Sequence, residues 1–240
     1  MTDSPTILVI SGHAADFVWR CGGVIAKYVG RGSRVHVTCL TFGERGESGG
    51  TWNKNPGISE EEVKAIRKAE ALKAADVLGA EISFFDWGDH PLRYSREEII
   101  ALTALMRDIR PDIVQTHSST DFMNPDHEAV FELTRWAVRA ATVPGVLPES
   151  EAIAVPHIYS FEPDQASLEN FKPHVYVDIS DVIEQKKAAM DAIATQVGYM
   201  GPRYVDRARF RASLLNMMED AEYAEAFVQY FAYEGDGFPR

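Results

Sequence analysis

The chain has 240 residues, of which 45% are hydrophobic and 10% aromatic, a composition that supports one large core and argues against a disordered chain. Its formal net charge of −12 argues against a nucleic-acid or anionic membrane-surface partner, because a phosphate-binding surface needs clustered Lys and Arg. The sequence shows neither a basic and apolar N-terminal leader nor an apolar run near the roughly 18 residues of a membrane span. Its two cysteines, Cys21 and Cys39, lie in apolar segments and form no disulfide framework, which predicts a soluble, cytoplasmic protein.

Apolar runs alternate with helical segments along the first two-thirds of the chain, the pattern of a parallel sheet with crossover helices. The expected strands cover residues 7–10, 35–42, 82–87, 112–116, 158–161 and 175–179. The expected helices cover residues 17–30, 59–79, 95–109, 126–141, 181–196 and 205–231, and a Gly-rich loop covers residues 43–57. The second of these helices has the clearest signals, since Ser59 and Glu62 form a capping box and Gly79 follows the last turn. We predict an α/β fold in a single domain over residues 1–240.

Titratable side chains follow four of the expected strands at the point where each strand ends. In open parallel sheets, ligands bind beyond the carboxyl ends of the strands, so these side chains are expected to meet at one edge. They are His13 and Asp16 after the first strand, Glu44, Arg45 and Glu47 after the second, Asp89, His90 and Arg93 after the third, and His117, Asp121, Asn124, Asp126 and His127 after the fourth.

Three of these residues, His13, Asp16 and His127, have the chemistry of a metal site. Two imidazole nitrogens and one carboxylate with an open position are the ligands of catalytic zinc sites and of related iron sites. The spacing of His13 and Asp16 is by itself equally typical of a loop histidine followed by an N-capping aspartate. Asp126 has a similar alternative, as a negative charge in the first turn of its helix. The second group of histidines and aspartates, in residues 117–127, favours the metal site.

Taken in order along almost the whole chain, five segments resemble the zinc-dependent PIG-L (LmbE-like) deacetylase family. That family carries A-H-P-D-D-E after its first strand, T-x-G-E-x-G after its second, R-x-x-E on its next helix, and P-D-x-V-x-x-H with H-P-D-H later. The segments here are SGHAADF, TFGERGE, IRKAEA, RPDIVQTHSSTDFMNPDH and, near the end, YAEAF. The resemblance implies a Rossmann-like three-layer fold, with helices on both faces of a mainly parallel sheet. It also implies a Zn²⁺ ion held by His13, Asp16 and His127, a ligand set that Fe²⁺ and Co²⁺ suit as well.

Two positions depart from the deacetylase pattern. Ala15 stands where the family has the aspartate that serves as general base, and a methyl group cannot accept a proton. Asn124 stands where the family has the histidine that protonates the leaving amine, and an amide cannot shuttle a proton. Because the loss of a positioned acid or base typically costs about 10²–10⁴ in rate, a routine deacetylase is not expected.

One branch of the family resembles this chain in the segments HAADFVWR and FGERGES. That branch consists of hydratases (hydro-lyases) that add water to the tricarboxylate 4-oxalomesaconate (4-carboxy-2-hydroxymuconate) in gallate and protocatechuate degradation. The resemblance implies this metal-dependent activity, with 4-carboxy-4-hydroxy-2-oxoadipate as the product. Two alternatives stay open. One is a zinc-dependent N-acyl (N-acetylglucosaminyl-type) deacetylase that takes its base from Glu44 or Glu47, and the other is a catalytically inactive metal-binding protein.

Hydration of such a substrate needs an acid and a base in addition to the metal. We expect them among Glu47, Glu44 and His157. Glu47 follows the second strand and is less general to the family than Glu44. The simpler interpretations are an orienting role for Glu44 and a place in the core for His157.

The substrate's carboxylates call for planar arginines, which bind carboxylates through two hydrogen bonds. Arg45 ranks first because it lies in the loop after the second strand, and Arg20 ranks second because it lies in the branch-specific segment. Asn124 is a further expected substrate contact, as a hydrogen-bond donor. The other arginine candidates are Arg93, Arg203 and Arg207, and the simpler interpretation of each arginine is a surface salt bridge.

Two smaller expectations concern the frame around the site. Arg67 and Glu70, three residues apart on one helix face, are expected to form a structural pair behind it. Glu225, in the segment YAEAF, is expected to pack or to cap a backbone group. The Pro-rich loop after residue 143 and the apolar C-terminal segment would suit a homo-oligomer, which we also expect.

Overall fold

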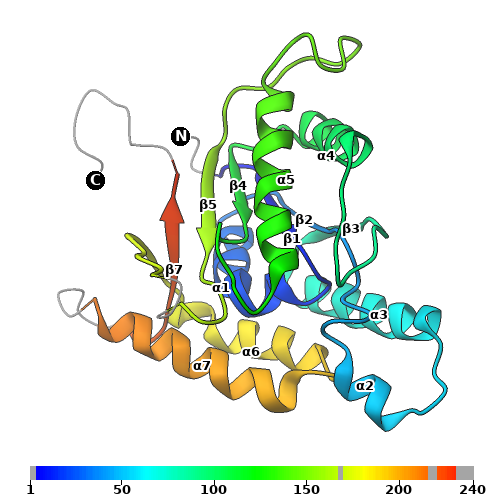
Figure 1. The fold of residues 1–240 in the computed structure, drawn as a ribbon. Helices are drawn as coiled ribbons and strands as arrows, with labels where there is room; N and C mark the ends of the chain where they lie inside the picture. Colours follow the sequence, from blue (N-terminus) through cyan, green and yellow to red (C-terminus); the bar gives the residue numbers. More distant parts are fainter. Residues whose placement is uncertain (1–3, 167–169, 216–220, 231–240) are drawn as a thin grey trace.

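The computed structural model describes residues 4–166, 170–215 and 221–230. Within these ranges the chain forms a seven-stranded sheet in the order β3-β2-β1-β4-β5-β7-β6 (Figure 1). The strands are β1 (Ile7–Ser11), β2 (Val35–Cys39), β3 (Glu81–Phe84), β4 (Ile113–Thr116), β5 (His157–Phe161), β6 (Val175–Asp178) and β7 (Ala224–Gln229). The helices are α1 (Asp16–Gly30), α2 (Gly49–Lys54), α3 (Glu60–Leu78), α4 (Arg96–Ile109), α5 (Pro125–Ala141), the 3₁₀ helix η1 (Ser180–Val182), α6 (Ile183–Ala192) and α7 (Val197–Ser213). The predicted α/β class is confirmed.

The central strand β1 shows how helices cover both faces of the sheet. Its side chains alternate, as the pleat of a strand requires. Ile7 and Val9 belong to the apolar cluster that includes residues of α1, α3, α6 and α7, whereas Leu8 and Ile10 belong to the cluster that includes residues of α4 and α5. A strand buried on both faces carries apolar residues at every position, which is why this segment could be recognised in the sequence.

The five strands from β1 to β5 are mutually parallel, so they end at one edge of the sheet. The loops after β1, β2, β3 and β4 leave the sheet at this edge and carry the polar residues singled out above. Figure 1 shows α6 and α7 lying along the same edge, below the arrowheads of β4 and β5. The topology therefore brings these loops together with the start of α7.

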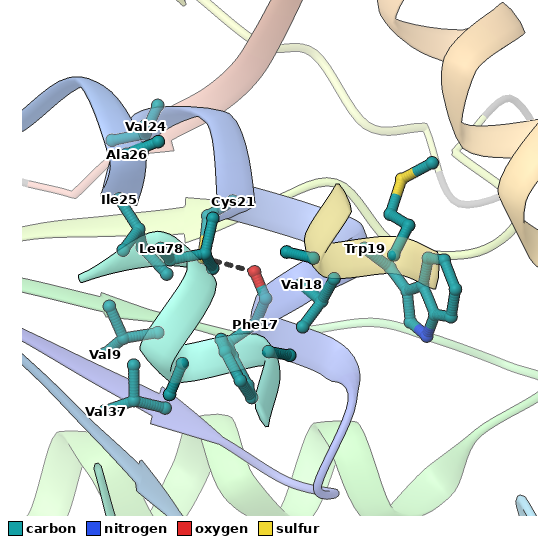
Figure 2. Packing of buried hydrophobic residues seen from close by; sticks show 14 of the residues in the cluster. Val9, Phe17, Val18, Trp19, Cys21, Val24, Ile25, Ala26, Val37 and Leu78 are labelled. Atoms are coloured by element: carbon teal, nitrogen blue, oxygen red, sulfur yellow. Dashed lines mark hydrogen bonds between the residues drawn. The ribbon is translucent and has the colours of Figure 1, made fainter. Parts of the chain in front are cut away.

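Helix α1 is broken close to the site, at Cys21, whose φ of −141° is not helical. The Sγ of Cys21 donates a hydrogen bond to the carbonyl oxygen of Phe17, drawn dashed among the buried side chains in Figure 2. Past the break, the backbone N–H groups of Gly23 and Val24 donate to the two carboxylate oxygens of Glu225, at 2.9 and 2.8 Å. Glu225 thus caps the second half of α1, which confirms that this glutamate caps a backbone group.

The C-terminal part of the chain differs from the prediction of one helix over residues 205–231. Helix α7 starts earlier and ends at Ser213, and residues Ala224–Gln229 form the strand β7. Residues 216–220 and 231 of the expected helix lie outside the described residues. β7 pairs antiparallel with β5 on one side and β6 on the other. Pairing on both edges satisfies its backbone and outweighs the helix propensity of its alanines and glutamate.

Local signals at other element ends are confirmed or refined. The capping box at Ser59 and Glu62 is present, and Gly79 ends α3 in a left-handed conformation with a φ of 74°. The short helix α2 lies inside the loop expected over residues 43–57. Among the helices of the described ranges, none is both long and apolar enough to cross a membrane.

Candidate metal centre

Four side chains meet beyond the carboxyl ends of β1, β2 and β4. His13 and Asp16 follow β1, Glu47 lies in the loop after β2, and His127 lies in the first turn of α5, after β4. One potential ligand atom from each of the four lies within 4.8 Å of all the others. The Nδ1 of His13 is 3.2 Å from the Nε2 of His127 and 3.2 Å from Oε1 of Glu47. The Nε2 of His127 is 3.4 Å from Oδ1 of Asp16. The three predicted ligands therefore converge, and Glu47 joins them.

A carboxylate faces the outer nitrogen of each imidazole. Nδ1 of His127 lies 2.8 Å from Oδ2 of Asp121, and Nε2 of His13 lies 3.5 Å from Oδ2 of Asp126. When a metal is bound, a proton shared with the outer carboxylate would leave the inner nitrogen of each ring with its lone pair, the arrangement typical of histidines that bind metals. Two lone pairs and two carboxylates around one point fit a divalent cation such as Zn²⁺.

The charges around the cluster act in the same direction. Burial alone would lower the pKa of His13, but the negative charges of Glu47, Asp126 and Asp16 outweigh it and hold that pKa well above its usual value. Burial alone would raise the pKa of Asp16, but His127 and His117 outweigh it and hold that pKa well below its usual value. The site thus attracts positive charge and keeps Asp16 ionised, the form in which a carboxylate binds metal.

Neither aspartate side chain caps its own helix, contrary to the simpler interpretation of Asp16, whereas Asp126 does lie in the first turn of α5. Asp16 accepts a hydrogen bond from the backbone N–H of His13 at 2.8 Å, and α1 has no side-chain cap. Asp126 accepts from the backbone N–H groups of His90 and Leu92, at 2.7 and 2.8 Å, and so ties the loop after β3 to the start of α5. Both carboxylates instead join segments of the site.

His117 supports the cluster from behind. Its ring stacks on that of His127 with centroids 4.0 Å apart, and its Nε2 accepts a hydrogen bond from the backbone N–H of Gly12 at 2.9 Å. Burial, followed by the charge of His127, lowers the pKa of His117 well below its usual value, so this ring is neutral. A neutral, buried and stacked ring restricts the orientation of His127.

Arg20 lies behind the predicted ligands instead of facing open space. Its side chain is only 2% exposed. Its Nε donates to Oδ1 of Asp16 at 3.3 Å, and its Nη1 donates to the carbonyl oxygen of Glu162 at 2.6 Å. Its Nη2 lies 3.3 Å from Nδ1 of His127 and 3.2 Å from Oδ1 of Asp164. The guanidinium is committed to protein groups, so the expected contact with substrate is replaced by a role in positioning Asp16 and His127.

Glu47 is held at the cluster by three elements of the fold. Its side chain is 17% exposed, and its Oε1 accepts a hydrogen bond from Nδ2 of Asn124 at 3.3 Å. Its backbone carbonyl accepts from Nε2 of Gln196 at 2.9 Å, at the corner between α6 and α7. Its Oε2 lies 3.8 Å from Nη2 of Arg67. Asn124 therefore contacts a predicted acid–base group, in the place where the deacetylase pattern has a histidine.

Glu44 has the orienting position that was the simpler interpretation of it. It is fully buried and accepts hydrogen bonds from the backbone N–H groups of Phe42 and Asp89, at 3.2 and 3.4 Å. Burial raises the pKa of its carboxyl group. Its backbone carbonyl accepts from Nε1 of Trp52 at 2.7 Å, which links α2 to the same loop.

His157 is not at the site, and its assignment as acid or base is corrected. It is the first residue of β5 and pairs in parallel with Ile113, the first residue of β4. The site lies at the other end of these strands, and four residues of β-strand span about 13 Å. The sequence places His157 at the start of its strand, but only the parallel pairing of β5 with β4 shows that this end lies away from the site.

The other predicted residues lie around the loop after β2. The guanidinium of Arg45 is 57% exposed and pairs with Glu60 at 2.7 Å. The Arg67–Glu70 pair is confirmed, at 3.1 Å, and Arg67 also donates to the carbonyl oxygen of Phe42. Gln196 was missed by the sequence analysis. No motif surrounds it, and only the tertiary contact with Glu47 marks it.

The chain is similar in sequence to known proteins. The family PIG-L (GlcNAc-PI de-N-acetylase) matches residues 8–138. The 4-oxalmesaconate hydratase of Pseudomonas putida is 40% identical over 195 residues, which cover 81% of this chain and 75% of that protein. A 1D-myo-inositol 2-acetamido-2-deoxy-alpha-D-glucopyranoside deacetylase of a Mycobacterium species (strain JLS) is 30% identical over 230 residues, covering 80% of this chain and 74% of that one.

Two solved structures extend the comparison to the fold. The crystal structure of GalB, the 4-carboxy-2-hydroxymuconate hydratase of Pseudomonas putida KT2440, matches with a TM-score of 0.93 and 34% identity, covering 98% of this chain and 100% of that one. The N,N'-diacetylchitobiose deacetylase of Pyrococcus horikoshii matches with a TM-score of 0.81 and 25% identity, covering 95% and 84% of the two chains. The predicted Rossmann-like three-layer fold is confirmed by these matches.

Proposed function

The chain belongs to the PIG-L family, and from that premise we propose that it is a 4-oxalmesaconate (4-carboxy-2-hydroxymuconate) hydratase, a hydro-lyase, and not a deacetylase. The similarity to the Pseudomonas hydratase, in sequence and in structure, supports the activity. Two positions beside the predicted ligands favour the hydratase activity over the deacetylase alternative, because of the chemistry of their side chains.

Those positions are Ala15 and Asn124. Ala15 is fully buried at the start of α1, where its methyl group offers no base toward the ligands His13 and Asp16. Asn124 donates its amide hydrogen to Glu47, and an amide cannot return a proton to a leaving amine. The centre thus keeps the ligands and lacks the proton-transfer pair that the family's amide hydrolysis uses. It keeps one well-placed carboxylate, Glu47, for a different proton transfer.

The reaction adds one water molecule across a carbon–carbon double bond. The water oxygen bonds to the carbon that carries the middle carboxylate, one water proton leaves to a base, and one proton is delivered to the adjacent carbon. His13, Asp16 and His127 would hold a divalent cation, which we propose is Zn²⁺, with Fe²⁺ and Co²⁺ suiting the same ligands; when bound, it would supply electrophilic stabilisation of the charge that develops on the substrate.

Residues of the protein orient the ligands and transfer the proton. Asp121 and Asp126 fix the rings of His127 and His13 through their outer nitrogens. Glu47 takes the proton from water, because its carboxylate lies among the predicted ligand atoms and is the one held there by a neutral amide, that of Asn124. Glu44, which is buried and bound to backbone N–H groups, keeps the Glu47 loop in place.

Substrate carboxylates are bound, in this proposal, by Asn124 and Arg45. Asn124 lies at the rim of the cluster, and its amide has a second hydrogen to donate. Arg45 pairs with Glu60 at the protein surface, and exposed pairs of this kind contribute only about 0–1 kcal/mol. Substrate can therefore draw the guanidinium away from Glu60 at little cost.

The test is an assay of the purified, metal-loaded protein. We expect loss of the ultraviolet absorbance of 4-carboxy-2-hydroxymuconate, abolished by a chelator and restored by Zn²⁺. The same preparation should release acetate from N-acetylglucosaminyl substrates only at the background rate. Rapid, chelator-sensitive acetate release without muconate hydration would establish the deacetylase alternative. Metal binding with neither activity would establish the inactive metal-binding protein.

We also propose a cellular location, a domain organisation and an oligomeric state for the enzyme. Free, buried Cys21 and Cys39 support a reducing cytoplasm. A sheet that takes β1 from one end of the chain and β7 from the other supports a single domain over residues 1–240. Exposed apolar side chains on α5 and in the segment before β5, with Trp136 58% and Val155 60% exposed, support a homo-oligomer. Light scattering of the purified protein tests the last point.

A further inference from the structure

The start of α7 lies directly beside the proposed base. Gln196, the residue before this helix, donates from its side chain to the backbone carbonyl of Glu47 at 2.9 Å. Tyr199, in the first turn, is 61% exposed. Its backbone N–H donates to the carbonyl oxygen of Gln196 at 3.2 Å, so Tyr199 lies one turn from the residue that contacts the Glu47 loop. The first turn of α7 thus forms part of the rim of the metal centre.

Arg203 lies four residues after Tyr199 and therefore on the same face of α7, about 6 Å farther along the helix axis. It is exposed and lines a cavity of about 640 Å³ together with Asp164, Phe171 and Phe210. Asp164 borders the rear of the metal centre, since its carboxylate lies 3.2 Å from the guanidinium of Arg20, which positions two of the ligands. Gln196, Tyr199 and Arg203 thus mark a path along one face of α7 that leads away from the loop of Glu47.

The arginines near this path differ in what they already bind. Arg207 donates to the carbonyl oxygens of Pro163 and Asp164, at 3.1 and 2.7 Å. Arg211 makes two bonds of 2.8 Å to the carboxylate of Glu162. Arg203 has no carboxylate within ion-pair distance among the residues described by the structure. It is the arginine of this wall whose charge is left for a ligand.

We propose that Arg203 and Tyr199 form the subsite for the substrate carboxylate farthest from the metal centre. This rests on the proposed hydratase function. A guanidinium presents two parallel N–H donors to a carboxylate, and the phenol adds an O–H donor nearer the cluster. With the oxo end of the substrate placed at the metal centre, the terminal carboxylate at the other end of its chain would lie some distance along the same wall. Arg203 and Tyr199 select for that charge, and therefore for a tricarboxylate over a shorter acid.

The test compares Arg203→Gln with Arg209→Gln. Arg209 lies on the same helix but pairs with Asp206 and with the hydroxyl of Tyr223, so its variant controls for a lost surface charge. Arg203→Gln should raise KM for 4-carboxy-2-hydroxymuconate by roughly 10–100-fold, the effect of one lost charged hydrogen bond, whereas Arg209→Gln should leave it within about 2-fold. Arg203→Lys should recover part of the loss, and Tyr199→Phe should show a smaller loss. Metal content should be unchanged in all of them.

A second substrate separates recognition of the carboxylate from a general loss of activity. The analogue in which the distal carboxylate is converted to a neutral amide should be a poor substrate for the wild-type protein, and Arg203→Gln should not weaken it further. Equal losses by Arg203→Gln on both substrates would overturn the proposal. The proposal would also be overturned if Arg203→Gln had the same KM for the muconate as Arg209→Gln.

A binding measurement keeps the subsite distinguishable from the proposed function. Tricarballylate has three carboxylates and no double bond, so it can bind but cannot be hydrated. Calorimetry should show its dissociation constant raised about 10-fold or more by Arg203→Gln and unchanged by Arg209→Gln. A wild-type protein that does not hydrate the muconate would refute the function alone, and the calorimetric comparison would still decide the subsite. Equal dissociation constants in the two variants would refute the subsite.

Discussion

The inner nitrogens of His13 and His127 lie 3.2 Å apart although the two residues are separated by 114 positions in the chain. One follows β1 and the other opens α5 after β4, and these strands are neighbours in the sheet. Each ring has its outer nitrogen next to a carboxylate, so the two lone pairs point at the same place. Two imidazoles aimed at the same place in a buried and acidic site fit the shared divalent cation that we propose.

Removal of either histidine should therefore remove the metal. We expect His13→Ala and His127→Ala each to lose stoichiometric metal, because two remaining ligands hold a divalent ion weakly. The measurement is elemental analysis of the dialysed proteins. His157→Ala is the matched control, since His157 lies at the opposite edge of the sheet, and it should keep full metal content. Full metal content in both ligand variants would refute the site.

Glu47→Gln should lower kcat by about 10²-fold or more, since glutamine keeps the shape of the side chain but cannot accept a proton. His157→Ala should leave kcat near the wild-type value. Steady-state kinetics beside metal analysis of the same preparations gives both numbers. A large loss in Glu44→Gln with near wild-type kcat in Glu47→Gln would move the base to Glu44. Near wild-type kcat in both glutamine variants would mean that no protein carboxylate serves as the base.

Arg45→Ala should mainly raise KM for the muconate, because a carboxylate receptor binds the ground state and the transition state alike. The control is Glu60→Gln, which frees the same guanidinium from its surface pair and should not raise KM. Initial rates over a range of substrate concentrations separate KM from kcat. An unchanged KM in Arg45→Ala would show that Arg45 does not bind the substrate.

Asp164 should contribute to the free energy of unfolding by an amount that changes with pH. Burial alone would raise its pKa, but the charge of Arg20, helped by His127 and the hydroxyl of Tyr204, lowers it to about 2. The folded protein thus binds the proton less readily than the unfolded chain, whose aspartate pKa is about 3.9. The resulting stabilisation is present above about pH 4 and is lost as the pH falls toward 2.

Asp164→Asn should therefore lower the free energy of unfolding by roughly 2 kcal/mol at neutral pH, with a deficit that shrinks as the pH falls from 4 toward 2. Urea unfolding of the metal-free proteins across this range gives the difference. Asp206→Asn replaces a carboxylate on α7 that is 74% exposed, and it should cost less than about 0.5 kcal/mol throughout. A deficit for Asp164→Asn that stays constant with pH would contradict the charge interaction.

The sequence by itself determined the features that depend on neighbouring residues. The apolar run at the start of the chain is buried on both faces, so the first four positions of β1, Ile7–Ile10, are all apolar. The capping box at Ser59 joins residues three positions apart, so its geometry is independent of the rest of the fold. The predicted ligands could also be found, because ligands of a parallel sheet gather where strands end, and the strands themselves were recognisable.

Only the tertiary structure decided the features that depend on which segments become neighbours. Residues 224–229 have the composition of a helix, and they form β7 because β5 and β6 offer two open edges. His157 could be placed only once the parallel register of β4 and β5 put it at the far edge from the metal centre. Gln196 contacts the loop of Glu47 across 149 positions of sequence, and no local pattern encodes such a contact. Backbone pairing and close packing act between residues that are distant in the chain, and they become defined only when the whole sheet has formed.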